Sequence, residues 1–278
     1  MARTRVELAE ALQGGRPRVL VPTMGALHDG HRALVRRARA VADPEGVVVV
    51  SVFVNPLQFG SAQDLAGYPR TLDHDLVVCS DEGVDVVWAP SVDVMYPGGT
   101  PAVTVSSGLP GSVLEGASRP GHFDGVLTVV TKLFGQVCPD VAVFGAKDAQ
   151  QVALVRRLVC DLDLPVTIET VDTVRAADGL ALSSRNGRLT VGGRRAATTL
   201  PRALSAAAAA APAGPASVIA AARAVLDAEP YLVLDYLALV DPETFAELEP
   251  GHVGAASVVV AGTVDGVRLI DNLTVACG

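Results

Sequence analysis

Residues 19–38 read VLVPTMGALHDGHRALVRRA and join an apolar strand pattern to an amphipathic helix pattern through a turn that contains glycine. The strand pattern ends at Pro22, and the helix pattern begins near His31. A strand that passes directly into a helix is the first part of a βαβ unit, and such units build parallel sheets. This stretch therefore predicts an α/β fold.

The same alternation continues along the chain as far as about residue 173. Strands are expected at 47–54, 84–90, 141–146 and 166–171, and helices at 31–41, 71–82, 126–137 and 148–160. Beyond this point the pattern predicts helices at 192–211 and 216–228, then strand runs at 231–240 and 257–270 with a hairpin turn at Asp265-Gly266. We expect a Rossmann-like, doubly wound parallel sheet in residues 1–173 and a smaller C-terminal α+β domain in residues 174–278.

Composition and charge narrow the class of ligand. Half of the residues are apolar and only 4% are aromatic, which is typical of β-branched strands covered by Ala-rich helices. A formal charge of -8 argues against nucleic acid as a partner, and no apolar run approaches the ~20 residues of a membrane span. The four cysteines lie too far apart in sequence to indicate a zinc knuckle, and the N-terminus lacks a signal core. We expect a cytoplasmic protein that binds a small molecule.

The turn after the first strand carries the most informative side chains. His28 and His31 flank the start of a helix, where free backbone N–H groups and the helix dipole attract phosphate. Gly25 and Gly30 would let a ligand approach the backbone closely, and the imidazoles could donate hydrogen bonds to a phosphate group. A surface helix with two histidines and a metal site that lacks a nearby third ligand are the alternatives. The position directly after a strand favours a nucleotide.

Two further clusters have phosphate-binding chemistry. Lys147 follows a second strand and could act as a point charge, while Asp148 could accept from a ribose hydroxyl or cap the next helix. Residues 183–185, Ser-Ser-Arg, combine hydroxyl donors with a guanidinium and suit pyrophosphate. Taken alone, that triplet also describes an ordinary solvated turn.

Polar side chains near other strand ends indicate a small polar ligand. Asn55 and Gln58 follow the strand run at 47–54, and their amides could recognise hydroxyl and carboxylate groups. Asn55 could instead only form the turn before a proline, and Arg119 and His122 could belong to a solvated loop. The stretch 64–75 is either a mobile flap or a linker.

Six blocks occur in a recognisable order: PTMGALHDGH, FVNPLQFG, YPRTLDHDL, EGASRPGHFDGVLTVV, FGAKDAQQ and ALSSRN. Together they resemble the pantothenate synthetase family of the His-x-Gly-His nucleotidylyltransferase-like superfamily, over most of the chain through Asn186. The resemblance implies that ATP and (R)-pantoate give pantoyl adenylate and pyrophosphate, after which β-alanine displaces AMP to give pantothenate. It also implies a homodimer, and Mg²⁺ held mainly by ATP oxygens and water, with no protein ligand assigned.

The resemblance also implies roles for residues at matching positions, with residues 1–173 binding ATP and pantoate and the C-terminal domain closing over the ATP phosphates. Catalytic roles fall on His31, His28, Lys147, Ser183 and Arg185. ATP is expected to contact Met24, Gly25, Ala26, Leu27, His28, Asp29, Gly30, His31, Gly145, Ala146, Lys147, Asp148, Val174, Leu182, Ser183, Ser184 and Arg185. Pantoate and β-alanine are expected at Gln58, Gln151 and Asn55.

The chain departs from the family pattern beside Lys147, where Ala146 and Ala149 replace the usual Glu and Tyr. This change puts the bracing of Lys147 in doubt. One rival is another nucleotidylyltransferase that acts on a phosphate substrate, but the neutral amides of Gln58 and Gln151 suit a hydroxy acid better. A second rival is a catalytically silent nucleotide-binding regulator, which the intact phosphate-binding side chains disfavour.

Overall fold

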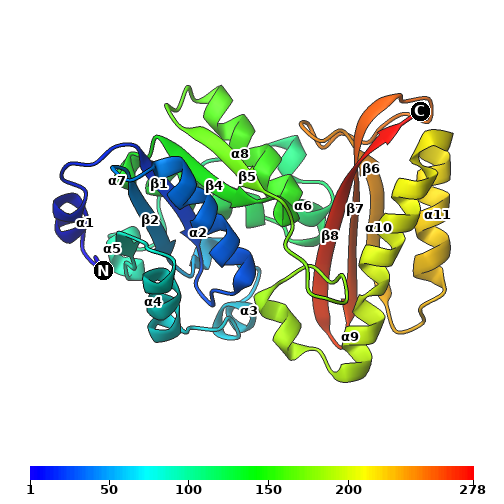
Figure 1. Cartoon of the computed structure of the whole chain (residues 1–278), viewed down its shortest axis with the longest axis horizontal. Helices are drawn as coiled ribbons and strands as arrows, with labels where there is room; N and C mark the ends of the chain where they lie inside the picture. The colour runs from blue at the N-terminus through cyan, green and yellow to red at the C-terminus, as the bar shows by residue number, and fades with distance from the viewer. The chain divides into compact units, whose positions relative to one another are not determined.

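The computed structural model describes residues 1–278, and the chain divides into two compact units. Unit 1 comprises Met1–Ala146 and Leu154–Asp172, and unit 2 comprises Lys147–Ala153 and Thr173–Gly278. In Figure 1 the sheet of unit 1 is drawn in blue to green and the sheet of unit 2 in orange to red. The short segment 147–153 follows a strand of unit 1 in sequence but belongs to unit 2.

Unit 1 is built on a parallel sheet of five strands in the order β3-β2-β1-β4-β5. Residues 19–21 of β1 and 48–51 of β2 are buried, as expected when helices cover both faces of a parallel sheet. Each strand run predicted before residue 173 is a strand, which confirms the Rossmann-like fold. The strands are β1 Arg18–Thr23, β2 Val47–Val52, β3 Val86–Trp88, β4 Val141–Gly145 and β5 Thr167–Val171.

Helices connect these strands. Val19 and Val21 of β1 pack with Leu34, Val35 and other residues of α2, so the intervening Leu20 faces the opposite side of the sheet. The helices begin and end as follows: α1 Arg5–Ala11, α2 Asp29–Ala42, α3 Ala62–Ala66, α4 Leu72–Asp81, α5 Val92–Met95, α6 Glu115–Ser118, α7 His122–Val137 and α8 Ala149–Asp161. Short 3₁₀ turns occur at η1 Pro56–Gln58, η2 Leu109–Gly111 and η3 Ala146–Asp148.

Unit 2 contains an antiparallel sheet of three strands in the order β6-β7-β8. The hairpin between β7 and β8 turns at Asp265-Gly266 as predicted, and both residues have positive φ. The strands are β6 Val233–Val240, β7 Gly254–Val264 and β8 Val267–Cys277. The helices are α9 Val191–Ala197, α10 Thr199–Ala210 and α11 Pro215–Asp227, with 3₁₀ turns η4 Ser184–Arg188 and η5 Ala211–Ala213.

The helix expected at 192–211 is interrupted and forms α9 and α10. Pro201 has no N–H to donate to the carbonyl of Ala197, which removes one helical hydrogen bond at this point. At the same point the Thr198 hydroxyl donates to the carbonyl of Arg195 at 2.7 Å. The pattern of apolar residues does not reveal this break because it continues with the same spacing on both sides.

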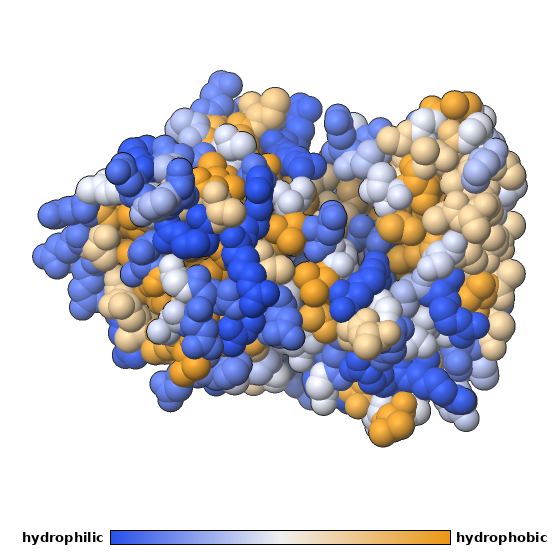
Figure 2. Space-filling model, in the orientation of Figure 1, coloured by the Kyte–Doolittle hydropathy of each residue, from blue (hydrophilic) through white to orange (hydrophobic).

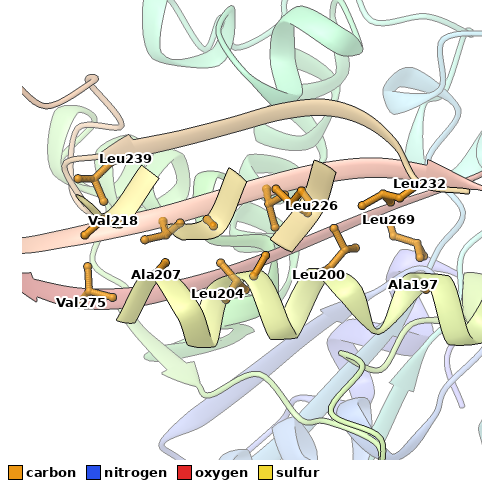
Figure 3. Close-up of a cluster of buried hydrophobic side chains, with 14 of the residues drawn as sticks. Ala197, Leu200, Leu204, Ala207, Val218, Leu226, Leu232, Leu239, Leu269 and Val275 are labelled. Carbon is orange, nitrogen blue, oxygen red and sulfur yellow. The ribbon is translucent and has the colours of Figure 1, made fainter. Parts of the chain in front are cut away.

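The core of unit 2 lies between the helices and the sheet, as Figure 3 shows. Ala203 and Ala207 of α10 are fully buried, and their small side chains allow close approach of the neighbouring elements. Leu200 and Leu204 of α10 meet Leu269 of β8 in the same cluster. Burial of this apolar area stabilises unit 2.

The visible surface over α2 and α4 is mainly hydrophilic, whereas the side that carries α10 and α11 is paler and more apolar (Figure 2). Arg32 and Arg36 of α2 form ion pairs with Glu82, which caps α4, at 2.9 and 2.7 Å.

No helix in the structure combines the length and apolar character needed to cross a membrane.

Candidate active site

The residues predicted to bind ligand in unit 1 follow the carboxyl ends of neighbouring parallel strands. β1 leads into residues 24–31, β2 leads into η1 with Asn55 and Gln58, and β4 ends at Gly145. The order of the strands reverses at β1, between its neighbours β2 and β4. Open α/β sheets bind ligands at such a switch point, so the sheet gathers these residues at the edge suited to a ligand.

A buried carboxylate shapes the turn after β1. Asp75 of α4 accepts hydrogen bonds from the backbone N–H groups of Ala26 at 3.1 Å and Leu27 at 2.8 Å, and from the Thr71 hydroxyl at 3.2 Å. Gly25 has φ of +83°, and a Cβ there would lie 2.8 Å from a carboxylate oxygen of Asp75. The turn therefore needs glycine at residue 25 and an acceptor at residue 75. The sequence did not indicate this role for Asp75.

His28 and His31 cap the start of α2 reciprocally. Nδ1 of His28 accepts from the backbone N–H of Gly30 at 3.1 Å, and Nδ1 of His31 accepts from the N–H of His28 at 3.2 Å. An imidazole nitrogen that accepts carries no hydrogen, so each neutral ring carries its hydrogen on Nε2. The two ring centroids are 4.2 Å apart. The cap thus places two neighbouring imidazoles that carry Nε2–H at a helix N-terminus, which is an arrangement suited to phosphate.

Asn55 and Gln58 form a buried pair after β2. The Asn55 amide donates to Gln58 Oε1 and to the Gly125 carbonyl, both at 3.0 Å. Its oxygen accepts from the N–H of Leu57 at 3.3 Å and from the Tyr96 hydroxyl at 2.7 Å. Because Oε1 of Gln58 faces Asn55, the Nε2 group of Gln58 is the part that points elsewhere as a donor. Asn55 uses its hydrogen-bonding groups within the protein and sets this orientation.

The side chains of Arg119 and His122 hold the backbone carbonyl of Gln58. Arg119 donates to the Gln58 carbonyl at 3.2 Å, and Nδ1 of His122 lies 2.8 Å from the same oxygen. Arg119 also lies 3.3 Å from Nε2 of His122. Because a guanidinium only donates, Nε2 of His122 is the acceptor and Nδ1–H is the donor to Gln58. Arg119 and His122 are therefore not parts of a simple solvated loop, since they brace the predicted substrate residue.

A hollow within unit 2 brings together three of the predicted catalytic residues. Lys147 comes from the segment after β4, while Ser183 and Arg185 come from the turn that forms η4. Ser183 begins that turn, and its Oγ accepts from the N–H of Arg185 at 3.2 Å. The hollow is lined by Lys147, Leu180, Ala181, Ser183, Arg185, Asn186, Leu200, Arg268, Leu269, Ile270 and Asp271. Among the cations of this lining, Arg268 is paired with Asp235, and Lys147 and Arg185 are the ones whose chemistry suits an anion.

The other predicted ligand-binding residues of unit 2 lie in or beside the two segments that contribute Lys147 and Ser183. The N–H of Leu182 donates to the carbonyl of Val174 at 2.9 Å, so the loop from 174 to 182 closes on itself. Gln151 lies half-buried in the first turn of α8. Asp148 is exposed, and its carboxylate lies 3.9 Å from Nζ of Lys147. No group of three or more His, Cys, Asp or Glu side chains is arranged to hold a metal ion.

A second network in unit 2 was not predicted. Arg175 forms a two-pronged ion pair with the buried carboxylate of Asp271, at 2.7 and 2.9 Å. The next residue, Asn272, donates from Nδ2 to the carbonyl of Lys147 at 2.8 Å. In the sequence, the one sign of this network is the acidic residue Asp271 within the apolar run of β8. The sequence does not identify Arg175 as its partner.

Comparison with known proteins gives one consistent family. The sequence model described as pantoate-beta-alanine ligase matches residues 1–274. A pantothenate synthetase from Leifsonia xyli subsp. xyli is 58% identical, and the match covers 91% of this chain and 87% of that protein. A pantothenate synthetase from Thermobifida fusca is 56% identical, with 95% of this chain and 93% of that protein covered.

Solved structures agree with the sequence comparison. The crystal structure of pantothenate synthetase from Thermus thermophilus is 47% identical with a TM-score of 0.90, and 98% of each chain is covered. The pantoate-beta-alanine ligase from Francisella tularensis, described in complex with beta-gamma ATP and beta-alanine, is 32% identical with a TM-score of 0.79. That match covers 98% of this chain and 96% of the other.

Proposed function

This chain belongs to the pantoate–β-alanine ligase family, and from that premise we propose how its residues carry out the reaction. The enzyme condenses (R)-pantoate with β-alanine to pantothenate and converts ATP to AMP and pyrophosphate. A carboxylate resists attack by an amine, so it must first gain a good leaving group. An oxygen of pantoate attacks the α-phosphorus of ATP, the bond to the β-phosphate breaks, and pyrophosphate leaves. The amine of β-alanine then attacks the acyl carbon, loses a proton and displaces AMP.

The capped histidine pair is the observation that carries this assignment. In the adenylation step, negative charge accumulates on the α-phosphate and on the departing pyrophosphate. The Nε2–H groups of His28 and His31 are fixed donors at the N-terminus of α2, so they can stabilise that charge without reorganising. Residues 24–27 and Gly30 supply the closely approached backbone, and Asp29 begins the helix. Phosphoryl transfer depends mainly on such positioning and charge stabilisation.

The hollow in unit 2 provides the complementary cations. Lys147 and Arg185 would neutralise the leaving pyrophosphate, and the Ser183 hydroxyl would donate to it. Gly145, Ala146 and Asp148 flank Lys147 and would contact ATP, with Asp148 accepting from the ribose. Val174 would lie beside adenine, with Leu182 and Ser184 adjoining the phosphate clamp. In this proposal the smaller domain supplies the residues that close over the phosphates.

The acid substrates are assigned to amide side chains. Nε2 of Gln58 would donate to pantoate, because Asn55 already holds the Oε1 atom. Asn55 thus acts through Gln58, and β-alanine would bind nearby. Gln151 would provide the second amide for pantoate. Neutral amides recognise hydroxyl and carboxylate groups without the extra positive charge that a phosphate substrate would need.

Mg²⁺ is proposed to accompany ATP, because the side chains assigned to the phosphates are hydrogen-bond donors or cations and leave the metal to phosphate oxygens and water. When bound there, the ion would neutralise charge on the phosphates. A homodimer and a cytoplasmic location are further proposals from family membership. Sedimentation velocity at several protein concentrations would test the dimer, and cell fractionation would test the location.

Exchange of labelled pyrophosphate into ATP tests the first half-reaction. With magnesium and pantoate present and β-alanine absent, we expect exchange, because the adenylate forms reversibly without the amine. Omission of pantoate is the control and should abolish exchange. Binding of ATP without pantoate-dependent exchange would contradict the adenylate route and favour another nucleotidylyltransferase or a silent nucleotide-binding regulator.

A further inference from the structure

A side chain on the last strand of unit 2 contacts the main chain of a proposed phosphate-binding residue. Asn272 of β8 donates from Nδ2 to the carbonyl oxygen of Lys147 at 2.8 Å. The two residues are separated by 125 positions in sequence. The bond joins two segments that both belong to unit 2, although residues 147–153 follow a strand of unit 1 in sequence.

Asn272 is itself held in place by an ion pair whose carboxylate is buried. Its backbone N–H donates to Oδ1 of Asp271 at 2.9 Å, and its carbonyl accepts from Arg175 at 3.4 Å. Arg175 engages both carboxylate oxygens of Asp271, whose side chain is 1% exposed. A two-pronged guanidinium–carboxylate pair has a defined geometry, so the main chain of Asn272 is fixed on both sides of its side chain.

The Arg175 side chain and backbone also contact the segment that leads to Ser183. Arg175 donates to the carbonyl of Gly179 at 3.1 Å and forms an isolated β-bridge with Ala181, two residues before Ser183. Arg175, Asp271 and Asn272 therefore connect the two chain segments that contribute Lys147, Ser183 and Arg185 to the hollow. Contacts of this kind set the distance between cations that must meet one anion.

We propose that Asn272, held by the Arg175–Asp271 pair, is a positioning residue for Lys147. The hydrogen bond fixes the peptide from which the long, flexible Lys147 side chain extends, and so directs its ammonium group into the hollow. The neighbours Ala146 and Ala149 have only methyl side chains with which to brace it, so support comes through the main chain. This inference rests on the phosphate-binding role proposed for Lys147.

Two substitutions remove the donor in different ways. Asn272→Asp keeps the shape of the side chain but replaces the donor with a carboxylate, and Asn272→Ala deletes the group. In both variants we expect pantoate-dependent pyrophosphate exchange to slow by roughly tenfold to a hundredfold, as for a misplaced reacting group. The KM for β-alanine in the second half-reaction, measured from preformed adenylate, should stay unchanged.

Asp241→Ala is the matched control for a loss of stability in unit 2. The Asp241 carboxylate accepts from the N–H of Glu243 and from the N–H and hydroxyl of Thr244, and it does not line the hollow. This variant should unfold at a lower urea concentration but exchange pyrophosphate at the normal rate. Equal slowing of exchange in Asp241→Ala and the Asn272 variants would overturn the proposal, because it would show a general effect of destabilisation.

A double-mutant cycle with Lys147→Ala gives the decisive measurement. If Asn272 acts through Lys147, Asn272→Ala should cause no further slowing once the ammonium group is absent. The same fold-loss in both backgrounds would overturn the positioning role while leaving the phosphate role of Lys147 intact. An unchanged exchange rate in Lys147→Ala alone would refute the role of Lys147, and with it this inference. Absence of exchange in the unmodified enzyme would instead refute the proposed function.

Discussion

At the scale of single residues, the two ring nitrogens of His28 have separate tasks. Nδ1 accepts from the backbone of Gly30 and caps α2, while Nε2–H is the donor assigned to phosphate. The helix cap made by Nδ1 contributes to stability, and the Nε2–H donor contributes to the reaction. Substitutions that keep only one of the two groups can therefore separate the two effects. Asn and Gln imitate different halves of the imidazole, because the Asn oxygen lies near the position of Nδ1 and the Gln amide nitrogen near that of Nε2.

We expect His28→Asn to preserve the stability of the protein but to slow pyrophosphate exchange by roughly a hundredfold or more, since Asn is a good N-cap but lacks the distant donor. His28→Gln should show the opposite balance, with about 1 kcal/mol less stability and a smaller loss of rate. Urea unfolding and the exchange assay measure the two effects. A normal exchange rate in His28→Asn would show that Nε2 does not assist the reaction.

Residue patterns predicted some of these side chains and not others. His28, Lys147 and Ser183 were identified because they follow strands or lie in polar loops, where ligand-binding side chains are common. Asp75 was placed in a presumed flap or linker, although it is buried and holds the turn at Ala26 and Leu27. Its role depends on a contact across almost fifty positions of sequence, and periodicity carries no information about such contacts.

At the scale of elements, the crossing of α2 with the end of α4 is stabilised by charge. Arg36 and Arg32 donate to Glu82, and these hydrogen bonds, that of Arg36 first, hold the pKa of Glu82 below its ordinary value of 4.5. A carboxyl group with a lowered pKa in the folded state stabilises the fold while it is ionised. The stabilisation is therefore present above the unfolded pKa and is lost as the pH falls through the folded pKa.

We expect Glu82→Gln to lower the free energy of unfolding by about 1 kcal/mol at pH 7, because it removes the charge but keeps the shape. The difference from the unmodified protein should shrink as the pH falls below 4.5, because Glu82 is then protonated in the unfolded state, and it should vanish once the pH has passed the lower pKa of the folded state. Urea unfolding of both proteins across this pH range measures the difference in the free energy of unfolding. Added salt should reduce that difference, because it screens the charges. A difference that stays constant down to the lowest pH would mean that lost packing, rather than charge, causes the destabilisation.

The succession of elements was largely predictable because local patterns determine it. The parallel strands, their connecting helices and the Asp265-Gly266 hairpin all follow from apolar spacing and turn residues. The division between α9 and α10 was missed because the apolar spacing runs through it, although Pro201 is the third residue of α10. Local rules therefore specify the order of elements better than their exact ends.

At the scale of the whole molecule, both units carry residues predicted to bind ATP. His28 and Gly25 belong to unit 1, whereas Lys147, Ser183 and Arg185 belong to unit 2. The sequence could indicate both sets but not that residues 147–153 group with unit 2. The bond from Asn272 to Lys147 joins parts of the chain 125 positions apart, and local patterns carry no information about such contacts. Measurements of ATP binding to variants can test the predicted residues of unit 1 and those of unit 2 separately.

Mg-ATP should stabilise the protein through residues of both units. A ligand that binds only the folded state at 100 times its Kd adds about 2.7 kcal/mol to the free energy of unfolding. We expect this gain to fall in His28→Asn and also in Arg185→Ala, because each removes a donor to the phosphates. The control Asp241→Ala should retain the full gain despite its lower baseline stability. If only one of the first two variants loses the gain, ATP binding in the absence of pantoate depends on that unit alone, and the other residue's assignment to ATP is wrong.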